Sequence, residues 1–145
     1  MLEKLMSCGK VAFVVLFCVS ARVNFPRYDS PFSPIQAVFS GALLALALLI
    51  TLLAIRLRQE DLYELGLCLV FWTLFTGAMA LFGLLMSTGC FDGALLALAL
   101  CLMPWWGLIF LFEFECAAMY WAVFSLSAVA LTACALLYWR AEKKG

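Results

Sequence analysis

The chain contains the stretch "IQAVFSGALLALALLITLLAI" at Ile35–Ile55, which carries no charged side chain. A bilayer core about 30 Å thick is crossed by roughly 20 residues of α-helix. Backbone amide and carbonyl groups in hydrocarbon need hydrogen-bond partners, and a helix supplies them within one continuous segment. The stretch therefore predicts a helix that crosses a membrane.

Three further runs without charged residues have similar lengths: Leu65–Met86, Ala94–Phe112 and Ala117–Trp139. The whole chain is 68% hydrophobic and 12% charged, whereas a soluble domain carries roughly 25% charged residues. Short polar connections separate the runs, so consecutive helices should lie antiparallel. We expect an all-α integral membrane protein whose membrane domain, residues 35–139, holds four transmembrane helices as two antiparallel hairpins.

The first part of the chain, residues 1–34, is open to several interpretations. Its apolar stretch Val11–Ala21 follows Lys4 and Lys10 and is too short to cross a bilayer alone. Residues 5–21 could form a signal sequence, a fifth span in which Lys10 reaches toward the surface, or a short helix that is interfacial or partly embedded. We favour the last interpretation, with a proline-rich surface segment after the helix.

The distribution of Lys and Arg predicts the orientation. If the N-terminal helix lies at the interface, most Lys and Arg residues fall on the side of both termini, including those of the basic C-terminal tail at 140–145. Only Arg56 and Arg58 fall on the other side. Lys and Arg are enriched in cytoplasmic loops. We therefore expect both termini on the cytoplasmic or matrix side of a bacterial plasma membrane or an organellar inner membrane.

An octapeptide, "GALLALAL", occurs at Gly41–Leu48 and again at Gly93–Leu100. Each copy opens a run that leads to an acidic turn and then to a second run containing tryptophan. We interpret the copies as an internal repeat of two parallel hairpin units. The alternative is chance, because Ala and Leu dominate many membrane helices.

Small residues at helical spacing occur in three of the runs. Lipid gives helices no hydrophobic reason to associate, so close contact relies on small side chains and hydroxyl groups. We expect these residues to contact neighbouring helices, either of the same chain or of a partner. The candidate packing residues are Gly41, Ala45, Thr73, Gly77, Gly83, Ala118, Ala122 and Ser125.

The run at 94–112 contains Pro104, followed by Trp105 and Trp106. A proline inside a helix removes a backbone donor and bends the helix. The region is therefore either a bent, aromatic-lined pocket for an apolar or cationic ligand or a kink filled by bulky packing. Glu64 stands at the mouth of the second run, where it either stabilises the helix N-terminus or binds an ion or substrate.

Several kinds of chemistry are missing from the sequence. The chain has no histidine, which is the commonest general base and a common zinc ligand. Its seven cysteines include no CxxC pair, and no Asp, Glu, Lys or Arg lies inside the four runs. Transporters coupled to protons usually carry such a residue. We expect no catalytic, cofactor-binding or metal site, and the formal net charge of zero gives no attraction for nucleic acid.

These features predict a non-catalytic multi-pass subunit that stabilises or positions partners in a larger membrane protein complex. Its contacts would be membrane lipids and other integral membrane subunits or further copies of itself. The alternative function is a small oligomeric transporter or channel for an ion or a lipophilic solute, with the path formed between copies.

Overall fold

The computed structural model describes residues 1–25, 33–57, 62–88, 102–108 and 117–143. Within these residues the chain forms four long α-helices and one short 3-10 helix. They are α1 (Leu2–Val23), α2 (Pro34–Leu57), α3 (Leu62–Thr88), η1 (Met103–Trp105) and α6 (Ala117–Glu142). All four α-helices are long and apolar enough to cross a membrane. The prediction of an all-helical, multi-pass membrane protein is confirmed at this level.

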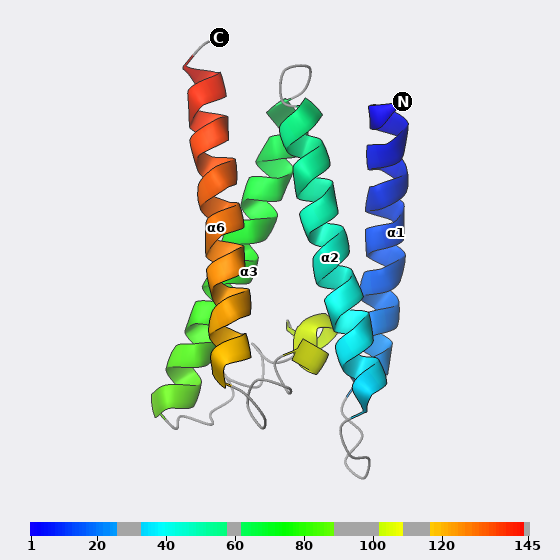
Figure 1. Cartoon of the computed structure of the whole chain (residues 1–145), viewed down its shortest axis with the longest axis vertical. Helices are drawn as coiled ribbons and strands as arrows, with labels where there is room; N and C mark the ends of the chain where they lie inside the picture. Colours follow the sequence, from blue (N-terminus) through cyan, green and yellow to red (C-terminus); the bar gives the residue numbers. More distant parts are fainter. Residues whose placement is uncertain (26–32, 58–61, 89–101, 109–116, 144–145) are drawn as a thin grey trace.

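The four long helices run alternately up and down, so that both termini lie at the same end of the molecule (Figure 1). α1 packs along α2, α3 packs along α6, and α2 contacts α3. α2, α3 and α6 contain the predicted runs 35–55, 65–86 and 117–139. The bundle therefore joins two closely packed helix pairs through α2 and α3.

Besides α2, α3 and α6, α1 is also long enough to cross a membrane. The short N-terminal helix predicted from the sequence forms part of this 22-residue helix. It continues through Lys10, whose charge is neutralised by Glu64 of α3. Because α1 runs the length of α2, Arg22 lies at the end away from the termini, and Arg56 lies at the terminal end (Figure 1). The expected placement of these two arginines was therefore wrong.

Of the predicted span at 94–112, the structure describes only residues 102–108. These residues form η1 and then a helical turn at 106–108. Pro104 lies in the first turn of η1, where a missing backbone N–H costs little because helix starts leave such groups unpaired. The proposed repeat needs Gly93–Leu100, which lies outside the described residues.

α2 begins with a pattern close to a capping box. The Ser33 backbone N–H donates to Gln36 Oε1 at 3.1 Å, and the Ile35 N–H donates to Ser33 Oγ at 3.4 Å. Such reciprocal bonds satisfy donors that the first helical turn leaves free. Gln36 Nε2 also donates to the Val23 carbonyl at 3.3 Å, so the cap ties the end of α1 to the start of α2.

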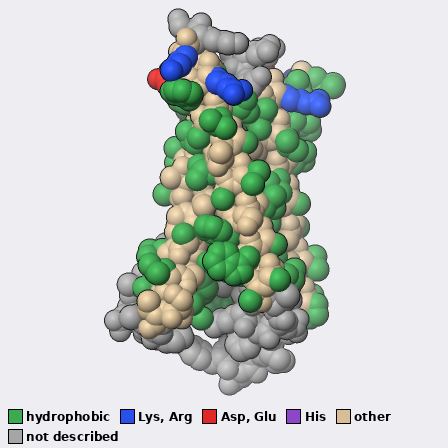
Figure 2. Space-filling view, turned by 60° about the vertical axis from the view of Figure 1, so that its left-hand side comes forward, with side chains coloured by type: hydrophobic (Ala, Val, Ile, Leu, Met, Phe, Trp, Pro, Cys, Tyr) green, Lys and Arg blue, Asp and Glu red, His purple; other side chains and the backbone are tan. Residues whose placement is uncertain are grey.

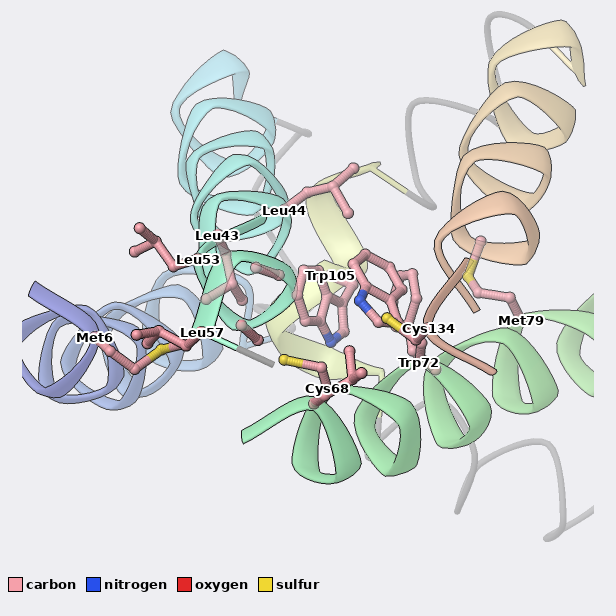
Figure 3. Close-up of a cluster of buried hydrophobic side chains, with 14 of the residues drawn as sticks. Met6, Leu43, Leu44, Leu53, Leu57, Cys68, Trp72, Met79, Trp105 and Cys134 are labelled. Atoms are coloured by element: carbon pink, nitrogen blue, oxygen red, sulfur yellow. The ribbon is translucent and has the colours of Figure 1, made fainter. Parts of the chain in front are cut away.

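The core of the bundle lies where α2, α3 and α6 meet. Figure 3 shows Trp72, Trp105, Cys68 and Cys134 gathered in this core. The Trp72 indole N–H donates to Thr51 Oγ1 at 2.7 Å, and the Thr51 hydroxyl donates to the carbonyl of Ala47 at 2.8 Å. This chain of bonds satisfies the buried polar groups and joins α3 to α2.

Glycine allows the close approach of α3 and α6. The Tyr120 hydroxyl donates to the Met79 carbonyl at 2.6 Å, and its ring lies against Gly83, where an added Cβ would collide with the hydroxyl. Gly66 lies against Tyr138, but an added Cβ there would be 3.5 Å from the ring, which is an ordinary van der Waals contact. The close approach of α3 and α6 therefore needs glycine at position 83.

Candidate functional site

A buried polar cluster lies where α1 ends and α2 begins. Ser20, Asn24 and Ser40 are buried, and all three side chains converge on the carbonyl oxygen of Pro104. The oxygen accepts hydrogen bonds from Ser20 Oγ at 2.5 Å, from Ser40 Oγ at 3.0 Å and from Asn24 Nδ2 at 3.2 Å. One backbone carbonyl is thus held by donors from two helices.

The Asn24 amide has two N–H groups and three acceptors within reach, so its 3.2 Å contact with the Pro104 carbonyl shares a proton with one of the two serine contacts. Because both serine hydroxyls donate to Pro104, their oxygens accept from Asn24 Nδ2, each at 3.0 Å. Asn24 Oδ1 is buried and has no hydrogen-bond partner among the described residues. All donors of the cluster are directed at each other or at the Pro104 carbonyl, so its effect is to fix η1 against α1 and α2.

Gly107 brings the same segment against the first turn of α2. A Cβ at this position would collide with the Gln36 carbonyl and come within 2.8 Å of the Ala37 nitrogen. Both of these are backbone atoms, which cannot rotate away as a side chain can. Gly107 is therefore required for the approach that places Pro104 within reach of the serines.

Trp105 anchors η1 in the apolar core. Its side chain is buried, and its ring centroid lies 4.7 Å from that of Phe75 and 6.1 Å from that of Phe71. Aromatic pairs at such separations attract each other beyond the effect of burial. Pro104 and Trp105 thus contribute packing and a hydrogen-bond acceptor, while the ligand pocket proposed for them and for Trp106 stays a prediction.

A second polar feature lies nearer the termini, where Lys10 of α1 forms an ion pair with Glu64 of α3. The Lys10 Nζ lies 2.5 Å from Glu64 Oε1, and the two side chains are 43% and 15% exposed, respectively. Glu64 stands in the first turn of α3, where the helix dipole also favours a carboxylate. The structure thus assigns the predicted candidate Glu64 a partner 54 positions away.

Lys10 was not predicted as a site residue. The sequence carried one signal, because an ionisable residue inside an apolar helix needs a partner or a path to the surface. The sequence did not show which carboxylate would provide that partner.

The ion pair stands at the edge of an apolar pocket. The pocket opens between α1, α2 and α3 and has a volume of about 260 Å³. Besides Lys10 and Glu64, the residues that line it are mostly apolar. They include Phe13, Val14, Ala47, Ile50, Leu67 and Phe71.

The predicted packing residues are distributed unevenly between seams and surface. Gly83 packs against Tyr120, whereas Gly41 and Gly77 have no heavy atom of another described segment within 4 Å of an added Cβ. Thr73 is exposed and donates to its own helix, at the Leu69 carbonyl, at 2.8 Å. The other exposed members of the predicted set are Ala45, Ala118, Ala122 and Ser125.

Within the described part of the chain, no group of three or more Cys, Asp or Glu side chains is placed to hold a metal ion. The four described cysteines, Cys8, Cys18, Cys68 and Cys134, are free thiols. No protein-family model matches the chain, and neither the curated proteins nor the solved structures include a significant match to it. A functional assignment therefore depends on the geometry of the molecule itself.

Proposed function

We propose that this chain is a non-catalytic multi-pass membrane subunit that stabilises or positions other integral membrane proteins. It would bind them through the exposed small-residue faces of α2, α3 and α6. One observation carries the proposal. Six of the eight predicted small residues are exposed, while the chain packs its own helices mainly through larger side chains and, from this set, through Gly83.

α3 illustrates this division within one helix. Gly83 accommodates Tyr120 of α6, whereas no described atom lies within 4 Å of an added Cβ at Gly77. Thr73 is exposed close to Gly77, and together they form a shallow face that another helix can approach closely. Helix association in lipid uses such faces because van der Waals contact and short interhelical distances supply much of the attraction.

Two described polar clusters support a non-catalytic role because most of their groups bind one another. Lys10 pairs with Glu64, and Ser20, Asn24 and Ser40 hold the Pro104 carbonyl. Each group therefore has a structural role that accounts for its position. Neither arrangement places a nucleophile beside a base, which covalent catalysis needs.

The charge distribution supports an orientation with both termini on the cytoplasmic or matrix side. Figure 2 shows Lys and Arg side chains gathered at one end of the molecule, which is the end where both termini lie in Figure 1. Arg56 and Arg140 stand in the last turns of α2 and α6 at this end. Arg22, in the last turn of α1, lies at the other end. Such a bias favours the terminal side as the cytoplasmic one.

Purification of the native protein in a mild detergent tests this proposal. We expect the chain to co-purify with a second integral membrane protein in fixed stoichiometry. Gly77→Ile should weaken that association, because it fills the exposed face of α3. The matched control is Val15→Phe, which adds bulk to an exposed position of α1, where no small-residue face is predicted.

Two outcomes would contradict the proposal. If the chain purifies only as a monomer, no partner uses its small-residue faces. If it purifies only with copies of itself, the small oligomeric transporter or channel becomes the better interpretation. Flux measurements in liposomes, with Trp105→Ala as the variant, would then test that function.

A further inference from the structure

We propose that the pocket beneath Lys10 and Glu64 binds one phospholipid with a primary-ammonium headgroup, of the phosphatidylethanolamine class. In this arrangement the lipid ammonium binds the Glu64 carboxylate, the lipid phosphate binds the Lys10 ammonium, and one acyl chain enters the pocket. The site is separate from the small-residue faces, so this inference does not rest on the proposed function.

The direction of the pocket matches the direction of a lipid. Along α1, Lys10 is followed by Phe13 and Val14, and along α3, Glu64 is followed by Leu67 and Phe71. Seven residues of helix from Glu64 to Phe71 span roughly 10 Å. The charged pair therefore lies nearer the terminal end of the bundle, and the apolar walls extend from it toward the middle, as an acyl chain extends from its headgroup.

The inner part of the pocket is suited to a hydrocarbon chain. The Thr51 hydroxyl lines it, but this group already donates to Ala47 and accepts from Trp72. Phe13 and Phe71 contribute aromatic faces, with ring centroids 5.6 Å apart in an edge-to-face arrangement. A ligand that reaches this depth gains most by burying apolar surface.

The two charges at the edge select a headgroup that carries both signs. Glu64 is the more buried partner and Lys10 the more exposed one. An anionic headgroup would bind Lys10 and leave the Glu64 carboxylate, which is only 15% exposed, without its counter-charge. A zwitterionic headgroup instead supplies a partner to each residue, so the ion pair is exchanged for two new ones.

The hydrogen-bonding capacity of the cation separates ethanolamine from choline headgroups. The Lys10 ammonium donates to Glu64 through an N–H group, and a primary ammonium has three such donors. It can therefore replace the bond that Glu64 loses, whereas the quaternary ammonium of choline has no donor. This difference favours the ethanolamine lipid.

The size and openness of the pocket favour entry of one chain from the bilayer. A volume of about 260 Å³ lies near the lower end of small-ligand pockets, which begin at roughly 300 Å³. Val14 lines the pocket and is also exposed, so its side chain marks a lateral opening between α1 and α3. The second acyl chain would remain in the surrounding lipid.

Native mass spectrometry of the full chain tests the proposal. The delipidated protein in detergent would be titrated separately with dioleoyl phosphatidylethanolamine, phosphatidylcholine and phosphatidylglycerol. We expect one bound phosphatidylethanolamine per chain, with an affinity at least about tenfold above that for the other two lipids. Glu64→Gln should remove this preference, because a neutral amide does not attract the lipid ammonium.

A steric variant keeps the test valid if Glu64→Gln fails to fold. Val14→Trp fills the pocket from its lateral opening and leaves the ion pair unchanged. Val129→Trp, at an exposed position of α6, is the matched control. We expect Val14→Trp to lose phosphatidylethanolamine binding at least about tenfold and Val129→Trp to retain it. Equal binding of the three lipids by the unsubstituted chain, or equal binding by the two tryptophan variants, would overturn the proposal.

Discussion

Near the middle of α1, Lys10 forms an ion pair with Glu64 of α3, and at the C-terminal end of α1 Ser20 and Asn24 bind Ser40 and the Pro104 carbonyl. Both contacts tie α1 to distant parts of the chain. The first uses two charges and lies beside an open pocket. The second uses neutral groups only and is buried.

This difference follows from where each contact lies. A charge pair that remains partly exposed keeps some of its hydration, so the cost of burial is limited. A polar group surrounded by protein and lipid has no water to replace a lost partner, and its hydrogen bonds must be satisfied internally. We infer that the polar cluster fixes the fold at the C-terminal end of α1, whereas the ion pair near the middle of α1 can open and exchange partners.

The largest expected effect is at Gly107, which brings the Pro104 carbonyl to the polar cluster. Gly107→Ala should lower the free energy of unfolding by about 3 kcal/mol, because the added Cβ collides with backbone atoms. The matched control is Gly41→Ala, where a Cβ has open space and where helix propensity favours alanine by up to about 1 kcal/mol. Thermal unfolding in detergent, followed by circular dichroism, measures both. Equal stability of the two variants would show that the segment does not pack on α2.

The next effect isolates one hydrogen-bonded member of the cluster. Ser40→Ala removes a donor to Pro104 and an acceptor for Asn24, so we expect a loss of about 2 kcal/mol in the same measurement. Ser125→Ala, at an exposed serine of α6, should change stability by less than about 0.5 kcal/mol. If both serine variants behave alike, the cluster does not hold the fold.

A smaller loss of stability is expected at the ion pair, and added salt should affect the ion pair but not the polar cluster. Lys10→Met keeps an apolar side chain of similar length and should cost about 1 kcal/mol, because the pair is partly exposed. In about 1 M salt the screening length falls to about 3 Å, so the difference between Lys10→Met and the unsubstituted chain should shrink. The loss of stability caused by Ser40→Ala should stay the same in salt. If Lys10→Met lowers stability equally at low and high salt, the ion pair does not differ from the polar cluster in the way proposed.

The sequence predicts α2, α3 and α6 because each contains a long run without charge. It does not predict the full length of α1, since Lys10 interrupts the apolar pattern and its compensating partner is 54 positions away. A hydropathy pattern places the end of an apolar helix at such a lysine. In the folded chain the lysine charge is neutralised by Glu64 of α3. Because α1 extends along α2, Arg22 and Arg56 lie at the ends opposite to those expected.

The polar cluster around the Pro104 carbonyl also cannot be predicted from local sequence patterns. Ser20 and Asn24 are four positions apart, so the sequence places them on one face of a helix. It does not show that the face meets a carbonyl 84 positions later in the chain, at Pro104. The signal that was present is Pro104 itself, since a proline within an apolar run marks a break in helical hydrogen bonding.

Local sequence also does not show which small residues contact another helix of the chain and which remain exposed. Spacing alone places Gly77 and Gly83 together as packing residues of one helix. Only the position of Tyr120 on α6 shows that Gly83 belongs to the internal seam. Sequence patterns therefore identify residues that permit close approach but not the helix that makes it.

The smallest expected effect on the isolated chain is at Gly77. Gly77→Ala should not lower the free energy of unfolding in detergent and should raise it by at most about 1 kcal/mol, because no described neighbour lies within 4 Å of an added Cβ and alanine favours a helix over glycine. Gly83→Ala is the matched control and should lower stability, since its Cβ meets the Tyr120 hydroxyl that binds Met79. A marked loss at Gly77 would place that residue in an internal contact and weaken the case for an external partner. If Gly77→Ala instead lowers co-purification of a membrane partner while detergent stability stays constant, the exposed face of α3 acts between proteins, in contrast to both contacts that hold α1 within the chain.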